Sequence, residues 1–137
     1  MFCMLQHDIA EIMNDELMVF LCGIYSLCFA IFHTRFWKLF DWKNDLKLLL
    51  PHNRAIMQIA NSRLIYFFLF VAAICFLFPD QLLTTSLGTF FLAGMSLFWL
   101  GRTIEQFIFL RVDHPMVHLL TYIFILGAVM FAIPIII

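Results

Sequence analysis

Four long apolar runs constrain this 137-residue chain more than any other feature of its sequence. The hydrocarbon core of a bilayer is about 30 Å thick, and a helix needs roughly 20 mostly apolar residues to cross it. The runs lie at about residues 17–34, 54–78, 82–110 and 115–137. Pro51, Pro79 and Pro115 stand between these runs or at their starts, where a proline favours a helix boundary. The sequence therefore predicts four transmembrane helices.

The composition agrees with a membrane environment. Hydrophobic residues make up 64% of the chain and charged residues 12%, whereas a soluble domain has about 25% charged residues. This number of charged residues is too small to cover a water-exposed surface. Lipid is therefore the expected solvent, and membrane lipid is an expected partner. The net charge of −1 gives no bias toward nucleic acid, and we expect no nucleic-acid partner.

The positions of the cations orient the four runs. Six of the eight Lys and Arg residues lie between or at the ends of the first two runs, and two lie near the junction of the last two: Arg35, Lys38, Lys43, Lys47, Arg54 and Arg63, then Arg102 and Arg111. All eight fall on one side of a four-span chain. Cytoplasmic loops carry an excess of Lys and Arg, so this side is predicted to be cytoplasmic. Both termini, with residues 1–16 as an acidic outer segment, then lie outside a plasma or inner membrane.

The predicted fold is all-α: a single integral membrane domain, residues 1–137, built as an antiparallel bundle of four transmembrane helices. Residues 35–53 are too apolar for an ordinary cytoplasmic loop. They either continue the first helix or form an interfacial helix on the inner leaflet. Six aromatic and basic residues are the expected interfacial anchors: Arg35, Trp37, Lys38, Trp42, Lys43 and Lys47.

Polar side chains of four helices are expected at one depth. A helix rises about 1.5 Å per residue, and counting from the outer ends places them near the inner edge of the bilayer. If they face inward, they form a cytoplasm-facing pocket for a ligand or lipid headgroup: Gln58, Asn61, Arg63, Arg102, Glu105, Gln106 and His118. Arg102 and Glu105, three residues apart, can pair on one helix face. The alternative is structural: arginine stems reach the lipid phosphates, and amides bond neighbouring backbone.

Small residues mark faces where helices can approach closely. Cys22, Ser26 and Ala30 form one stripe, Ala128 and Ala132 a second, and Gly94 and Gly101 lie a heptad apart. Contacts within the bundle explain such stripes, and so does association with another copy or with a membrane-protein partner.

Motifs for chemistry are weak in this sequence. His114 and His118 have a spacing that can hold a metal, and His33 and His118 lie at similar depth, as axial haem ligands would. No further ligand completes the metal set, and no other pattern supports the one possible haem pair. We therefore predict no cofactor and regard an enzyme as the less favoured class. The leading interpretation is a small non-enzymatic membrane protein, an accessory or scaffold subunit acting through helix contacts. A binder or transporter of a small amphiphile or anionic headgroup is the alternative, and a membrane haem or metal protein comes third.

Overall fold

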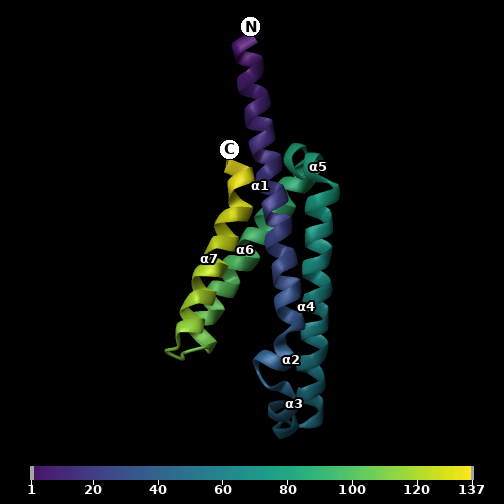
Figure 1. Ribbon diagram of the computed structural model, residues 1–137, viewed down its shortest axis with the longest axis vertical. Coiled ribbons are helices and arrows are strands. Elements are labelled where there is room, and N and C mark those ends of the chain that lie inside the picture. The colour runs from purple at the N-terminus through teal and green to yellow at the C-terminus, as the bar shows by residue number, and fades with distance from the viewer. Residues whose placement is uncertain (1, 137) are drawn as a thin grey trace. The chain divides into compact units, whose positions relative to one another are not determined.

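A computed structural model of the chain describes the backbone of residues 2–136 and the side chains of residues 14–136. Almost all of this backbone is helical, and no strand occurs within it, so the all-α prediction is confirmed. The elements follow one another along the chain (Figure 1) as α1 (Phe2–Thr34), α2 (Phe36–Leu39), α3 (Trp42–Asp45), the 3₁₀ turn η1 (Leu46–Leu48), α4 (Pro51–Leu77), α5 (Pro79–Thr84), α6 (Ser86–Phe109) and α7 (Pro115–Ile136).

Four of these helices are long and apolar enough to cross a membrane. They are the Asn14–Thr34 part of α1 and the whole of α4, α6 and α7. The prediction of four membrane-spanning helices is confirmed in this respect, by their length and composition. The prediction of an outer acidic segment falls mainly on residues 1–13, which lie outside the residues whose side chains are described.

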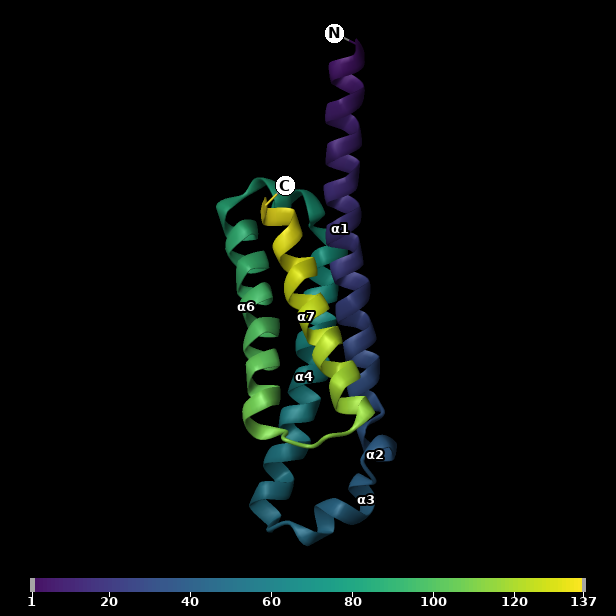
Figure 2. The same cartoon turned by 90° about the vertical axis from the view of Figure 1, so that its left-hand side faces the viewer.

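Contacts divide the chain into two compact units, Met1–Cys22 with Cys75–Ile137, and Gly23–Ile74. In the first unit, α6 and α7 run antiparallel and lie side by side (Figures 1 and 2). The Ser96 hydroxyl donates to the Ala128 carbonyl at 2.8 Å, a bond that satisfies a polar group between two apolar helices. One turn further along α6, the rings of Trp99 and Phe124 stack with centroids 5.7 Å apart.

The early part of α1 also belongs to this first unit. The ring of Phe20 lies 5.1 Å from that of Phe76. The thiol of Cys22 donates to the carbonyl of Met130 at 3.3 Å, so the small residue allows close approach to α7.

In the second unit, the end of α1 packs antiparallel on α4. The Phe29 and Phe68 rings lie 5.5 Å apart, and His33 lies beside Asn61. Positions 26, 29 and 30 of α1 and 68, 71 and 72 of α4 are buried, at the three- and four-residue spacing of a packed helix face.

The segment after α1 is neither a continuation of that helix nor one surface helix. It consists of α2, α3 and η1, and Asp41 between α2 and α3 takes a φ of 44°, a left-handed conformation that Asp tolerates better than most residues. Arg54 of α4 donates to the carbonyls of Leu46 and Lys47 at 2.7 and 3.3 Å and holds η1 against α4. Location at a membrane interface stays a prediction for this segment.

The third apolar run contains a corner that separates α5 from α6. Thr85 is extended, and its hydroxyl accepts from the Gly88 amide at 3.0 Å, which caps the start of α6. The long helix therefore begins at Ser86, four residues later than predicted. A Cβ at Gly88 would collide with the backbone of Gln81 and Leu82, so the corner requires glycine there.

Candidate functional site

His33 and Asn61, which were predicted to share a depth, are in direct contact. The His33 Nδ1 and Asn61 Oδ1 atoms lie 2.8 Å apart, and the Asn61 amide donates to the His33 backbone carbonyl at 3.1 Å. The imidazole also stacks on Phe36, with centroids 4.4 Å apart. This amide therefore has a structural use, joining α1 to α4.

Gln58 and Arg63 lie near Asn61 on α4 but are directed to a more open surface. Together with Ile59 and Ser62 they line a shallow pocket of about 510 Å³. The guanidinium of Arg63 lies 5.8 Å from the Tyr66 ring centroid, a cation–π contact within its own helix.

Arg102 is the most enclosed cation of the predicted pocket. Its guanidinium lies over the ring of Phe124, 4.8 Å from the centroid, and so joins α6 to α7. Glu105, predicted to pair with it, is exposed. Because α6 begins at Ser86, Arg102 lies about 24 Å along the helix from its start and about 10 Å from its end.

Gln106 lies next to the connection between α6 and α7. Its Nε2 donates to the Val117 carbonyl at 3.2 Å, and its Oε1 is buried without a hydrogen-bond partner among the described residues. The side chain lines a pocket of about 450 Å³ with Arg111, His118 and Thr121. His118 Nε2 in turn lies 2.9 Å from the exposed Asp113 carboxylate.

The predicted pocket residues thus form two groups, one in each unit. Gln58, Asn61 and Arg63 belong to Gly23–Ile74, and the other four, Arg102, Glu105, Gln106 and His118, belong to the other unit. A single pocket made by both groups stays a prediction. Arg111 lines the Gln106 pocket and was not predicted to do so; its place one residue beyond Leu110, at the end of the apolar run, was the available signal.

The predicted interfacial anchors differ in their exposure. Trp42 is buried, at 7% exposure, and its ring lies 5.6 Å from Phe36. Trp37 is half exposed, and the four basic anchors are exposed: Arg35, Lys38, Lys43 and Lys47. Trp42 thus contributes to the packing of the loop itself.

Metal ligation finds no support in the described residues. Within residues 14–136, no three His, Cys, Asp or Glu side chains are placed to hold one ion. His114 Nδ1 accepts from the Met116 amide at 3.2 Å, at the start of α7, and His33 and His118 have the partners given above.

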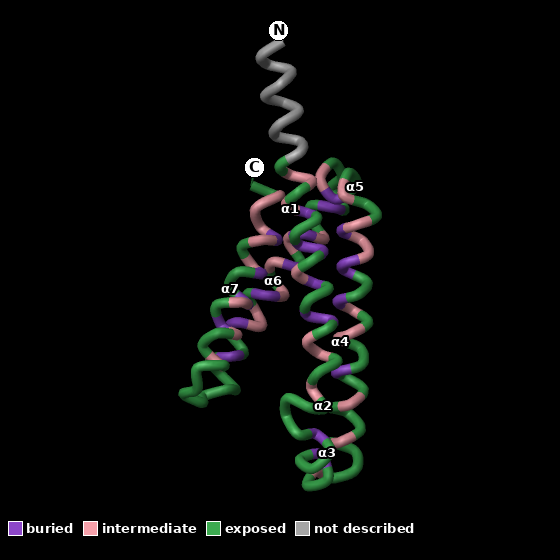
Figure 3. Tube along the Cα trace, in the orientation of Figure 1, coloured by how far each residue is buried: buried purple, intermediate pink, exposed green. Residues whose placement is uncertain are grey.

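Gly94 and Gly101 were noted in the sequence, but the exposed apolar face of α6 to which they belong was not. This face carries large apolar residues and glycines at alternating spacings of three and four: Leu87, Phe90, Gly94, Leu97, Gly101, Ile104 and Ile108. We call this set the outer face of α6. Leu87, Phe90 and Leu97 are 78%, 77% and 66% exposed, and a Cβ at Gly94 or Gly101 would meet nothing within 4 Å. The opposite side of α6, including Leu92, Met95 and Trp99, is buried. Figure 3 shows buried and exposed positions alternating along the long helices of the chain.

No protein-family model, curated protein or solved structure matches the chain. The geometry of its own residues therefore carries the functional argument.

Proposed function

We propose that this chain is a small non-enzymatic integral membrane protein, an accessory or scaffold subunit that binds another transmembrane helix through the outer face of α6. The observation that carries the proposal is the pair of open glycines, Gly94 and Gly101, set between large exposed side chains on one heptad-spaced stripe.

The spacing suits a partner helix. Residues alternating by three and four lie along one side of a helix and form the seam of left-handed helix pairs. Gly94 and Gly101 are two turns apart, about 10 Å, and leave hollows. Phe90 and Leu97 project on either side of Gly94 and supply the knobs. A partner helix with side chains at matching intervals can fill these hollows.

Lipid alone would not require these glycines. Flexible acyl chains pack on any apolar surface, and an interior glycine weakens a helix by about 1 kcal/mol relative to alanine in water. Between membrane helices, by contrast, small residues permit close backbone approach and favourable van der Waals contact. The glycines therefore support a contact with another helix.

The test replaces each glycine with leucine, whose side chain occupies the open space beside it. We expect Gly94→Leu and Gly101→Leu each to abolish a complex detected by native mass spectrometry in gentle detergent and by crosslinking in membranes. Thr89→Leu is the matched control, because it adds a leucine at an exposed position on another side of α6. A wild-type chain that stays monomeric and partner-free in both measurements would contradict the proposal, as would a complex that survives both glycine substitutions.

The proposed subunit lies in a plasma or inner membrane with both termini outside. The clustering of Lys and Arg in residues 35–63 and 102–111 supports this orientation.

A second candidate function is binding or transport of an anionic headgroup or small amphiphile near the inner ends of α6 and α7. The buried Gln106 Oε1 without a partner favours it, since such an atom is costly unless something donates to it. Arg102 and Arg111 supply positive charge nearby. We expect Arg102→Ala to remove co-purified anionic lipid and Lys47→Ala to leave it bound. Equal content of anionic lipid in both variants, measured by native mass spectrometry, would exclude this function.

A further inference from the structure

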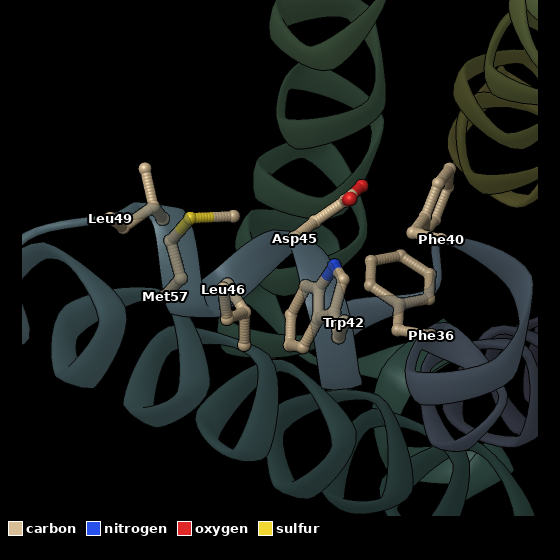
Figure 4. Close-up of a pocket in the computed structure, with 7 residues that line it drawn as sticks. All are labelled: Phe36, Phe40, Trp42, Asp45, Leu46, Leu49 and Met57. Carbon is tan, nitrogen blue, oxygen red and sulfur yellow. The ribbon is translucent and has the colours of Figure 1, made fainter.

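The loop between the first two spans has an open pocket of its own. It has a volume of about 420 Å³, within the range of small-ligand sites, and lies between α2, α3, η1 and the start of α4. In Figure 4 the rings of Phe36, Phe40 and Trp42 lie toward one end, and Leu49 and Met57 lie at the other. Leu46 lines the wall between them. We call this site the loop pocket.

The aromatic end presents one accessible ring. Phe36 packs nearly at right angles to Phe40 and Trp42, with centroids 4.9 and 5.6 Å apart, and His33 stacks on it. Trp42 is 7% exposed, whereas Phe40 is 40% exposed, so Phe40 is the ring that a ligand can reach. Aromatic faces carry negative charge density and attract organic cations.

A carboxylate completes this end of the pocket. Asp45 lines it, and Figure 4 shows its carboxylate on the side of Trp42 that faces Phe40. It is the ionisable residue in the lining, so the pocket itself is negative. That charge disfavours a purely anionic headgroup and favours an ammonium group.

Positive charge surrounds the pocket without entering it. Lys38, Lys43 and Lys47 are exposed on α2, α3 and η1, and none of them lines the pocket. Exposed cations on the elements that line the pocket would favour a phosphate attached to a bound ammonium group. The arrangement of charges is complementary to a zwitterion.

The surroundings favour a lipid over a soluble ammonium compound. Leu48 and Leu50 are 87% and 61% exposed beside the pocket, and the loop joins two membrane-spanning helices. An amphiphile can cover such leucines with its chains while its headgroup occupies the pocket.

We propose that the loop pocket binds the ammonium headgroup of a zwitterionic phospholipid, carrying choline or ethanolamine. The ammonium lies against the ring of Phe40 and beside Asp45. The phosphate is directed to the lysines, and the adjoining carbons lie against Leu49 and Met57. The site is separate from the outer face of α6, and neither proposal depends on the other.

The test compares two lipids that differ in the headgroup alone. The purified full chain is titrated in gentle detergent with dihexanoylphosphatidylcholine or dihexanoylphosphatidylglycerol, and bound lipid is counted by native mass spectrometry. Wild type is expected to bind the choline lipid more tightly. Asp45→Asn, which removes one charge at nearly constant shape, is expected to weaken choline-lipid binding about three- to tenfold.

Asp41→Asn is the matched control. It makes the same change in the same loop, outside the pocket lining; asparagine also tolerates a left-handed backbone and can still accept the 2.9 Å bond from Asn44. Its affinity for the choline lipid should equal that of wild type. Equal loss in Asp41→Asn and Asp45→Asn would overturn the proposal, and so would equal binding of the two lipids by wild type.

Phe40→Leu provides an independent variant. It keeps an apolar side chain at a partly exposed position and removes one aromatic face, so the preference for the choline lipid should fall while the thermal unfolding temperature stays at the wild-type value. An unchanged preference in a folded Phe40→Leu chain would show that the Phe40 ring does not bind the ammonium.

Discussion

Asn61 shows how a single polar residue is used in this chain. Its amide bonds both the side chain and the backbone carbonyl of His33, and the residue is 7% exposed. An unsatisfied amide among apolar helices is costly, so the two bonds specify how α4 and the end of α1 meet. Asn61 was predicted to line a ligand pocket, and its contact with His33 gives it a structural role.

Replacing Asn61 by alanine should therefore destabilise the second unit. We expect Asn61→Ala to lower the free energy of unfolding by about 1–2 kcal/mol, because it removes the two hydrogen bonds that join α4 to the end of α1 at this level. Denaturation by SDS in mixed micelles measures the change. Asn53→Ala, the same substitution at an exposed position of α4, should have little effect. Equal destabilisation by both variants would refute a specific role for the Asn61–His33 contact.

At the scale of the elements, the corner between α5 and α6 depends on close backbone approach. Gly88 lies against Gln81 and Leu82, whereas Gly94 faces open space on the same helix. These two glycines of α6 are therefore present for different physical reasons.

Alanine substitution separates those reasons. Gly88→Ala should lower the free energy of unfolding by about 1–3 kcal/mol, because a Cβ there meets backbone that cannot move aside cheaply. Gly94→Ala should leave it unchanged or raise it by at most about 1 kcal/mol, through better helix propensity. The same detergent-unfolding measurement compares them. Equal free energies of unfolding for Gly88→Ala and Gly94→Ala would contradict the close approach of Gly88 to the backbone of Gln81 and Leu82.

Much of this helical framework could be predicted because it depends on local rules. Pro51, Pro79 and Pro115 stop one helix or start the next, and each lies at a helix start in the structure. The contact between His33 and Asn61 could be anticipated as a shared depth, since helix rise is constant and consecutive spans run antiparallel.

The remaining features depend on helix rotation or on interactions that sequence spacing does not encode. Spacing suggested Glu105 as the partner of Arg102, but it gave no sign that the guanidinium also lies over Phe124, on a different helix. The left-handed Asp41 divides the loop after α1, and the Thr85 cap delays the start of α6. Asp and Thr occur in many other backbone settings. The residue types alone therefore could not predict the break at Asp41 or the helix start after Thr85.

At the scale of the whole molecule, the distribution of charge and the four apolar helices lead to one arrangement. All eight Lys and Arg residues fall in 35–63 and 102–111, and none lies in residues 79–81 or after 111. Moving a cation across a membrane is unfavourable, and loops that retain cations stay on the cytoplasmic side. We therefore propose that an even number of crossings leaves both termini on the outer side.

Single-cysteine chains test this orientation. In a background with the four native cysteines replaced by alanine, Ile136→Cys should react with a membrane-impermeant maleimide on intact cells. Lys43→Cys should react after permeabilisation only, because the loop between the first two spans is expected inside. The measurement is the labelled fraction of each chain before and after permeabilisation.

Lys43→Cys and Ile136→Cys also serve as controls for each other, since both lie at exposed positions and differ in the side of the membrane that we assign to them. Labelling of Lys43→Cys on intact cells, with Ile136→Cys protected, would reverse the orientation and place the loop pocket on the outer leaflet. Labelling of Ile136→Cys and Lys43→Cys on the same side would be incompatible with four crossings, because three spans lie between the loop and the end of α7. The charge asymmetry would then need another cause, and the inner-edge position of Arg102 and His118 would lose its basis.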